Sequence, residues 1–186
     1  FKLELNSGLS AWHSNLAPTF GGFDPLVAVR QIPNGYYGPH RVNKFGFIGN
    51  GHEDPLLNTF PEKVPHLKRI ILLGNSTTAG GGVNFNHETI SAQLEKKLNS
   101  YLELKGSLTR VQVLNFGSAG GYTAAELIKV LSQLRYFDPD MVISLDGYGD
   151  AWNLIIEHRR LGLDHPIVNW SDYNYGYFEY MNSLPS

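Results

Sequence analysis

The sequence predicts an α/β fold in three layers, a parallel sheet with flanking helices, preceded by a loop-rich N-terminal arm. Three observations predict it. Short apolar runs are bounded by turn residues, amphipathic helical segments alternate with these runs, and glycine-rich turns follow them. Strand, helix, strand, helix and strand follow one another between residues 70 and 145. This order implies a parallel sheet with right-handed crossovers.

Residues 1–65 form the arm in this interpretation, because they are rich in Gly, Pro, Asn and aromatic residues and keep no sustained period. We expect one or two short strands there, and we expect residues 66–186 to form the α/β domain. The first strand of the sheet is predicted at residues 70–73. Four consecutive apolar residues lie there between basic residues and Gly74, as in a buried parallel strand.

The later elements follow from the same patterns. Apolar residues at four-residue spacing predict a helix over residues 88–104, and a short apolar run predicts a strand over 111–114 that ends at Asn115. A second helix is predicted over 123–136, with an apolar side formed by Ala125, Ile128, Leu131 and Leu134. After a turn at residues 138–139, residues 141–145 are predicted to form a third buried strand.

Composition excludes several classes of function. The 186 residues are 42% hydrophobic, which suffices for the core of one domain. Fifteen basic against 17 acidic residues do not supply the positive charge of a nucleic-acid binder. The chain has no cysteine, and its seven histidines are too scattered for a metal site, so we expect neither a metal nor another cofactor.

No apolar run reaches the length of about 20 residues that a membrane helix needs. The printed chain begins at Phe1 rather than Met, which leaves room for an N-terminal leader or anchor before it.

Chemistry in a parallel sheet collects beyond the carboxyl ends of the strands. Three glycine-rich or turn-like segments lie there: GNSTTAGGG from Gly74, FGSAGGYT from Phe116 and DGYGD from Asp146. The first segment has no lysine near Gly80, so it is not a phosphate loop of the P-loop type, and neither glycine cluster has the G-x-G-x-x-G spacing of a dinucleotide loop.

Ser76 lies two residues after Gly74, just beyond the first strand, and this position is typical of an acyl-accepting nucleophile. The alternative is structural. For an isolated serine or threonine after a strand, such as Ser76 or Thr77, capping of the next turn is the commoner role. Both interpretations stay open at this point.

The neighbouring residues resemble a known family. The segments at residues 69–80 (RIILLGNSTTAG), 113–126 (VLNFGSAGGYTAAE) and 137–150 (FDPDMVISLDGYGD) are similar, in order, to the first three blocks of the SGNH/GDSL-type hydrolases. Residues 41–50 (RVNKFGFIGN) resemble the N-x-x-G-F-R-G element that precedes block one in exported or membrane-anchored bacterial members. The resemblance implies an SGNH/flavodoxin-like fold. It also implies that the protein is located on the periplasmic or extracellular side, with or without a membrane anchor.

The resemblance also implies roles for individual residues. Ser76 matches the nucleophile, and Gly120 matches the glycine whose N–H joins the oxyanion hole, with Gly121 close behind. Gly149 occupies the position of the family's Asn, the third oxyanion donor, and loss of one such donor costs about 10² to 10³ in rate. Asn153, one helical turn later, is a candidate substitute, although a solvent-facing helix residue is the simpler interpretation.

The general base of the family is a histidine in a D-x-x-H element, and no segment up to Ser186 has this spacing. Asp164 and His165 are adjacent, so they do not provide it. We therefore expect the domain to be incomplete at its C-terminus, because a serine without a base is a poor nucleophile. None of the histidines matches the position of the base: His13, His40, His52, His66, His87, His158 and His165.

Two functions remain open. The first is a serine hydrolase of acyl esters of carbohydrate or lipid, with the Asp and His supplied by a further C-terminal portion. The second is a catalytically inactive SGNH-like domain that serves as a structural or binding subunit of a larger, membrane-associated assembly with a protein partner. The aromatic-rich residues 169–182 are predicted to cover the domain as a lid, or else to stack on sugars or dock a partner.

Overall fold

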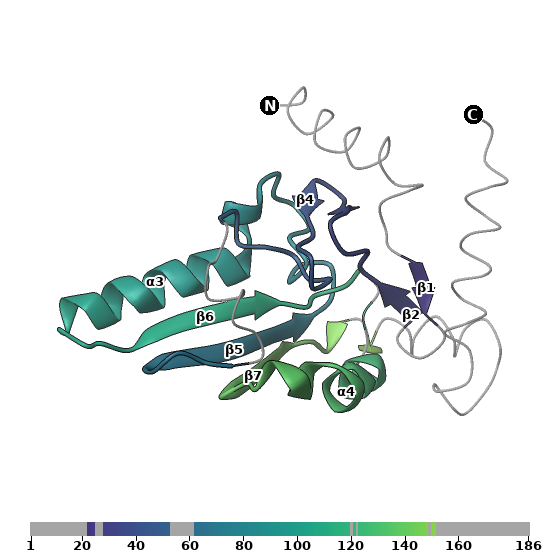
Figure 1. Ribbon diagram of the computed structural model, residues 1–186. Helices are drawn as coiled ribbons and strands as arrows, with labels where there is room; N and C mark the ends of the chain where they lie inside the picture. The colour runs from purple at the N-terminus through teal and green to yellow at the C-terminus, as the bar shows by residue number, and fades with distance from the viewer. Residues whose placement is uncertain are drawn as a thin grey trace, which may run out of the picture.

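The computed structural model describes residues 22–24, 28–52, 62–119, 121, 123–148 and 150–151. It contains a parallel sheet of three strands in the order β6-β5-β7 (Figure 1). The strands are β5 (Leu67–Gly74), β6 (Arg110–Asn115) and β7 (Met141–Leu145), and both outer strands run parallel to β5. The prediction of an α/β fold with a parallel sheet is confirmed.

Helical segments connect the strands. The 3₁₀ helix η2 (Asn86–Glu88) and helix α3 (Ile90–Leu104) lie between β5 and β6. Helix α4 (Thr123–Ser132) and the 3₁₀ helix η3 (Leu134–Phe137) lie between β6 and β7. The predicted second helix is therefore correct in place but ends earlier in α-helical form, because the chain tightens into a 3₁₀ turn before β7.

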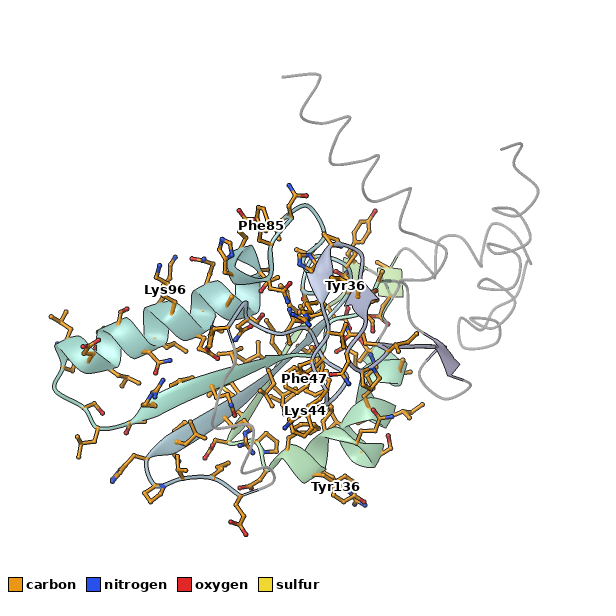
Figure 2. The ribbon with its side chains drawn as sticks, turned by 45° about the horizontal axis from the view of Figure 1, so that its top comes forward. Tyr36, Lys44, Phe47, Phe85, Lys96 and Tyr136 are labelled. Atoms are coloured by element: carbon orange, nitrogen blue, oxygen red, sulfur yellow. The ribbon has the colours of Figure 1, made fainter. Side chains whose placement is uncertain are left out.

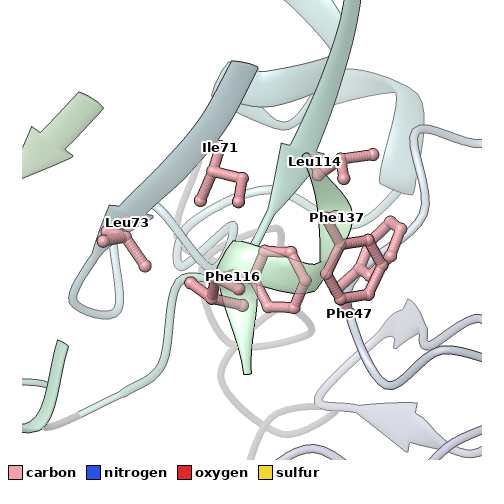
Figure 3. Packing of buried hydrophobic residues seen from close by; sticks show 7 residues of the cluster. Phe47, Ile71, Leu73, Leu114, Phe116 and Phe137 are labelled. Atoms are coloured by element: carbon pink, nitrogen blue, oxygen red, sulfur yellow. The ribbon is translucent and has the colours of Figure 1, made fainter. Parts of the chain in front are cut away.

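The two helices pack on opposite faces of the sheet. On one face, Leu94 and Leu98 of α3 pack against the cluster Ile70, Leu72 and Val113. On the other face, Val130 of α4 packs against a cluster that holds Phe47, Ile71, Leu73, Leu114, Phe116, Leu134 and Phe137 (Figure 3). Consecutive residues of β5 thus alternate between the faces, as the pleat of a strand requires.

The predicted burial of β7 is wrong for this structure. Met141, Val142 and Leu145 are 54%, 42% and 47% exposed. β5 lies in the centre with a strand on each side, whereas β7 is an edge strand whose described partner is β5 alone. Apolar composition does not distinguish a central strand from an edge strand, which explains the difference.

The predicted apolar side of α4 is also wrong in part. Leu131 is 61% exposed, whereas Glu126 and Lys129 are buried at 6% and 9% exposure. Two ionisable side chains thus take positions that an apolar stripe would fill. Their partners explain this arrangement and are described with the site below.

In its described residues the arm contributes two short hairpins, where one or two short strands were expected. β1 (Gly22–Asp24) pairs antiparallel with β2 (Ala28–Arg30), and β3 (Tyr36–Tyr37) pairs antiparallel with β4 (His40–Arg41). After β4, Ile48 forms an antiparallel bridge to Asn115, so the arm joins the sheet at the carboxyl end of β6. In the part of the chain that the structure describes, no helix is long and apolar enough to cross a membrane.

Candidate functional site

The first two predicted loops meet at the carboxyl ends of β5 and β6. The Ser118 N–H donates to the Gly74 carbonyl at 2.9 Å. A Cβ added to Gly117 would lie 2.5 Å from the backbone nitrogen of Ala79. The backbone of the first loop therefore passes directly over Gly117, and this position has no room for a side chain.

The third loop lies beside the first loop, on the side of β5 that is away from β6. Gly74 pairs with Leu145, so the chain leaves β5 and β7 at the same level of the sheet. In that third loop, the Asp150 carboxylate accepts hydrogen bonds from the N–H and the hydroxyl of Thr123, at 3.1 and 2.7 Å. Asp150 therefore caps the start of α4 and ties the third loop to the end of the second.

Ser76 is half-buried in the turn that follows β5. The turn is closed by the bond from the Gly81 N–H to the Ser76 carbonyl at 2.6 Å and by the bond from the Ala79 N–H to the Asn75 carbonyl at 3.0 Å. Among the described residues, none hydrogen-bonds to the Ser76 hydroxyl or to its backbone N–H. Both groups are thus available to a ligand as far as the described chain is concerned.

The capping interpretation of Ser76 is not supported. The side chain that caps this turn is Asn75, whose Oδ1 accepts the Thr77 N–H at 3.2 Å. Within the described ranges, neither Ser76 nor Thr77 accepts a backbone N–H through its hydroxyl. Among the described residues, the Ser76 hydroxyl therefore makes no bond that would explain a serine at this position of the turn.

Asn115 links the first two loops from below. It is fully buried, its Nδ2 donates to the Thr78 carbonyl at 2.8 Å, and its Oδ1 accepts the Gly117 N–H at 3.0 Å. From the sequence, Asn115 was expected only to end a strand. Buried polar groups need hydrogen-bond partners. An asparagine at the end of a buried strand, directly before a glycine-rich loop, therefore indicates that its amide binds the backbone of the loop.

An acidic pair lies at the same end of the sheet. Glu126 of α4 accepts a hydrogen bond from the Ser144 hydroxyl at 3.0 Å. Burial, followed by the adjacent Asp146 carboxyl, raises the pKa of Glu126 to about 7, and burial also raises the pKa of Asp146. The two carboxyl groups together therefore retain a proton at mildly acidic pH. The other buried ionisable residue of α4, Lys129, donates to the Ser118 hydroxyl at 2.6 Å.

Three of the four described histidines have partners other than Ser76, and the fourth, His66, is exposed in the turn before β5. His40 lies against the Gly80 carbonyl at 2.9 Å, His52 lies 3.3 Å from a carboxylate oxygen of Glu95, and His87 stacks on Phe85. No histidine or carboxylate of the described part is bonded to Ser76, and no cluster there could hold a metal ion. His13, His158 and His165 lie outside the described residues.

Of the predicted site residues, the structure places Ser76 and Gly121 at the same end of the sheet. A Cβ on Gly121 would lie 3.3 Å from the Gly74 carbonyl and 3.7 Å from the Cα of Asn75. Gly120, Gly149 and Asn153 lie outside the described residues, as does the aromatic segment at 169–182, and their roles stay predictions.

The arrangement places the Ser76 hydroxyl and N–H, which no described residue engages, beside two glycine-rich loops, and such groups are what acyl transfer to a serine requires. No protein-family model matches this chain, and a search of the curated proteins finds no match either.

Proposed function

We propose that this protein is a serine ester hydrolase of the SGNH/GDSL type that acts on acyl esters of carbohydrate or lipid. One observation carries the proposal: Ser76 lies at the carboxyl end of the central strand, and no described residue engages its hydroxyl or its amide. In the proposal, the sheet with helices on both faces is part of the three-layer SGNH arrangement.

The proposed reaction starts with attack of Ser76 Oγ on the ester carbonyl carbon. The C–O bond to the alcohol then breaks, the alcohol leaves with a proton, and water hydrolyses the resulting acyl-serine to release the acid. The N–H groups of Ser76 and Gly120 are the proposed donors to the oxyanion. A histidine base with its aspartate must take up the serine proton, and this chain as printed has no D-x-x-H spacing to supply it.

Gly149 sets an expectation for the rate. Without the family's Asn amide, the hydrolase would be about 10² to 10³ slower, unless another amide such as that of Asn153 replaces it. The resemblance of residues 41–50 to exported bacterial members supports a location on the periplasmic or extracellular side.

A fluorophosphonate probe tests the proposal on the natural full-length protein. We expect the probe to label Ser76, as located by peptide mass spectrometry, and we expect Ser76→Ala to abolish both labelling and hydrolysis of p-nitrophenyl butyrate. Ser100→Ala, which changes an exposed serine on α3, is the matched control and should react as the wild type does. A folded full-length protein that neither labels nor hydrolyses would contradict the proposal.

Gly149 favours a second candidate function, since it stands where the family has its Asn. In this alternative the domain is catalytically inactive and serves as a binding or structural subunit of a larger assembly. It predicts an unlabelled Ser76 together with co-purification of a stable protein partner. An active, strictly monomeric protein would rule it out.

A further inference from the structure

Three side chains of the arm reach the backbone of the two loops that form the candidate site. Gln31 Nε2 donates to the Gly117 carbonyl at 2.6 Å, and the Tyr37 hydroxyl accepts the Ala119 N–H. The ring Nε2 of a third residue, His40, lies 2.9 Å from the Gly80 carbonyl, and because a carbonyl only accepts, this nitrogen carries the proton.

These three side chains are buried between the arm and the loops. Gln31, Tyr37 and His40 are 5%, 2% and 1% exposed. Each bond runs from a side chain of the arm to the main chain of a loop. The identity of the arm residue therefore decides whether the loop has a partner, while the loop sequence itself does not.

The fit between the arm and the first loop is close. Gly80 has a φ of +94°, and a Cβ there would lie 2.5 Å from His40 Nε2. Burial, as the largest effect, lowers the pKa of His40, and burial raises the pKa of the Tyr37 hydroxyl. Both groups are therefore neutral near pH 7 and act as ordinary hydrogen-bonding groups.

We propose that Gln31, Tyr37 and His40 are positioning residues, which hold the Ser76 loop and the Gly117–Ala119 segment in the conformation that the candidate site requires. The effect on hydrolysis rests on the proposed function, whereas the hold on the loops does not. Gly120, the proposed oxyanion donor, directly follows Ala119 in the sequence. An oxyanion donor must be positioned to within fractions of an ångström. Loosening Ala119 should therefore displace the N–H of Gly120 and lower the rate of acyl transfer.

Two substitutions remove the bonds described above and nearly retain the side-chain volume: Tyr37→Phe and Gln31→Met. Tyr36→Phe is the matched control, because Tyr36, labelled in Figure 2, is the neighbouring residue of the same strand and is 56% exposed. Backbone amide exchange of the segments 75–82 and 116–119 reads the loops directly. The rate of fluorophosphonate labelling and the separate kcat and KM values for p-nitrophenyl butyrate read the site.

We expect exchange of the segment 116–119 to be about fivefold faster in Tyr37→Phe and Gln31→Met, as for the loss of one hydrogen bond. Labelling and kcat should fall about tenfold with little change in KM, at a temperature where circular dichroism shows the variants folded. Tyr36→Phe should match the wild type in each measurement.

Unchanged exchange in both variants would overturn the inference, whatever the activity. Faster exchange with unchanged labelling and kcat in an active protein would also overturn it, because the loops would then not need the arm for the reaction. If the wild type itself is not labelled at Ser76, the proposed function fails, and the exchange data alone decide whether the arm holds the loops.

Discussion

The acidic pair predicts an unusual dependence of stability on pH. Glu126 is 6% exposed and its pKa is raised to about 7, first by burial and then by the adjacent Asp146 carboxyl. In the unfolded chain a glutamate titrates near pH 4.3. Between these two pH values the folded protein binds more protons than the unfolded chain, so the free energy of unfolding falls as the pH rises.

The size of the effect follows from the two pKa values. An isolated site with pKa values of about 4.3 and 7 loses about 2.5 kcal/mol between pH 5 and pH 8. Coupling to Asp146 and access of water to the pair reduce this value, and we expect about 1 to 2 kcal/mol. Glu126→Gln replaces the protonated acid with a neutral amide of the same shape. It should therefore be close to the wild type in stability at pH 5 and more stable than it at pH 8.

Urea unfolding of the wild type and the variant, measured from pH 5 to pH 8, gives this difference directly. Glu103→Gln, at an exposed position near the end of α3, is the matched control and should retain the slope of the wild type. A wild-type stability that does not change over this range would refute the reasoning. The reasoning would also be refuted if the free energy of unfolding of Glu126→Gln depended on pH as strongly as that of the wild type.

Two further predictions concern packing and charge. Gly117→Ala should destabilise the protein by about 3 kcal/mol in urea unfolding, because its Cβ meets the backbone of the first loop, whereas Gly49→Ala, with only ordinary contacts, should change little. Asp140 is held by Lys63, by Lys68 and by a backbone N–H; although burial opposes it, these bonds hold the pKa of its carboxyl well below the usual value. This contribution is fully present above the usual pKa of an aspartate and shrinks as the pH falls below it, so the advantage of the wild type over Asp140→Asn should shrink from about pH 5 to pH 2; an advantage that stays constant over this range would contradict this.

The elements of the sheet were predictable because their signals are local. Apolar runs with turn residues at both ends located β5 and β6 to within a few residues, and β7 has the predicted bounds of Met141–Leu145. The exposure of β7 was not predictable in this way. It depends on which strand lies in the centre, and strand order is a property of the whole sheet.

The site was predictable only in part, for the same reason. Ser76 carries a local signal, since it follows a buried strand in a glycine-rich turn. The burial of Glu126 depends on Ser144 and Asp146, which come from another strand and another loop. The bond from Gln31 to Gly117 joins residues 86 positions apart, and no periodic pattern indicates such a pair.

The loops of the candidate site owe their conformation to side chains from elsewhere in the chain. A loop lacks the repeating backbone bonds of a helix or strand, so its carbonyl and N–H groups need other partners when they are buried. Here Asn115 supplies them from the end of β6, and the arm supplies them through Tyr37 and His40. A chain built this way can lose the geometry around Ser76 through a substitution 39 positions away in sequence, at Tyr37, without any change in the loops themselves. Comparisons of this site with others should therefore include the arm as well as the glycine-rich segments.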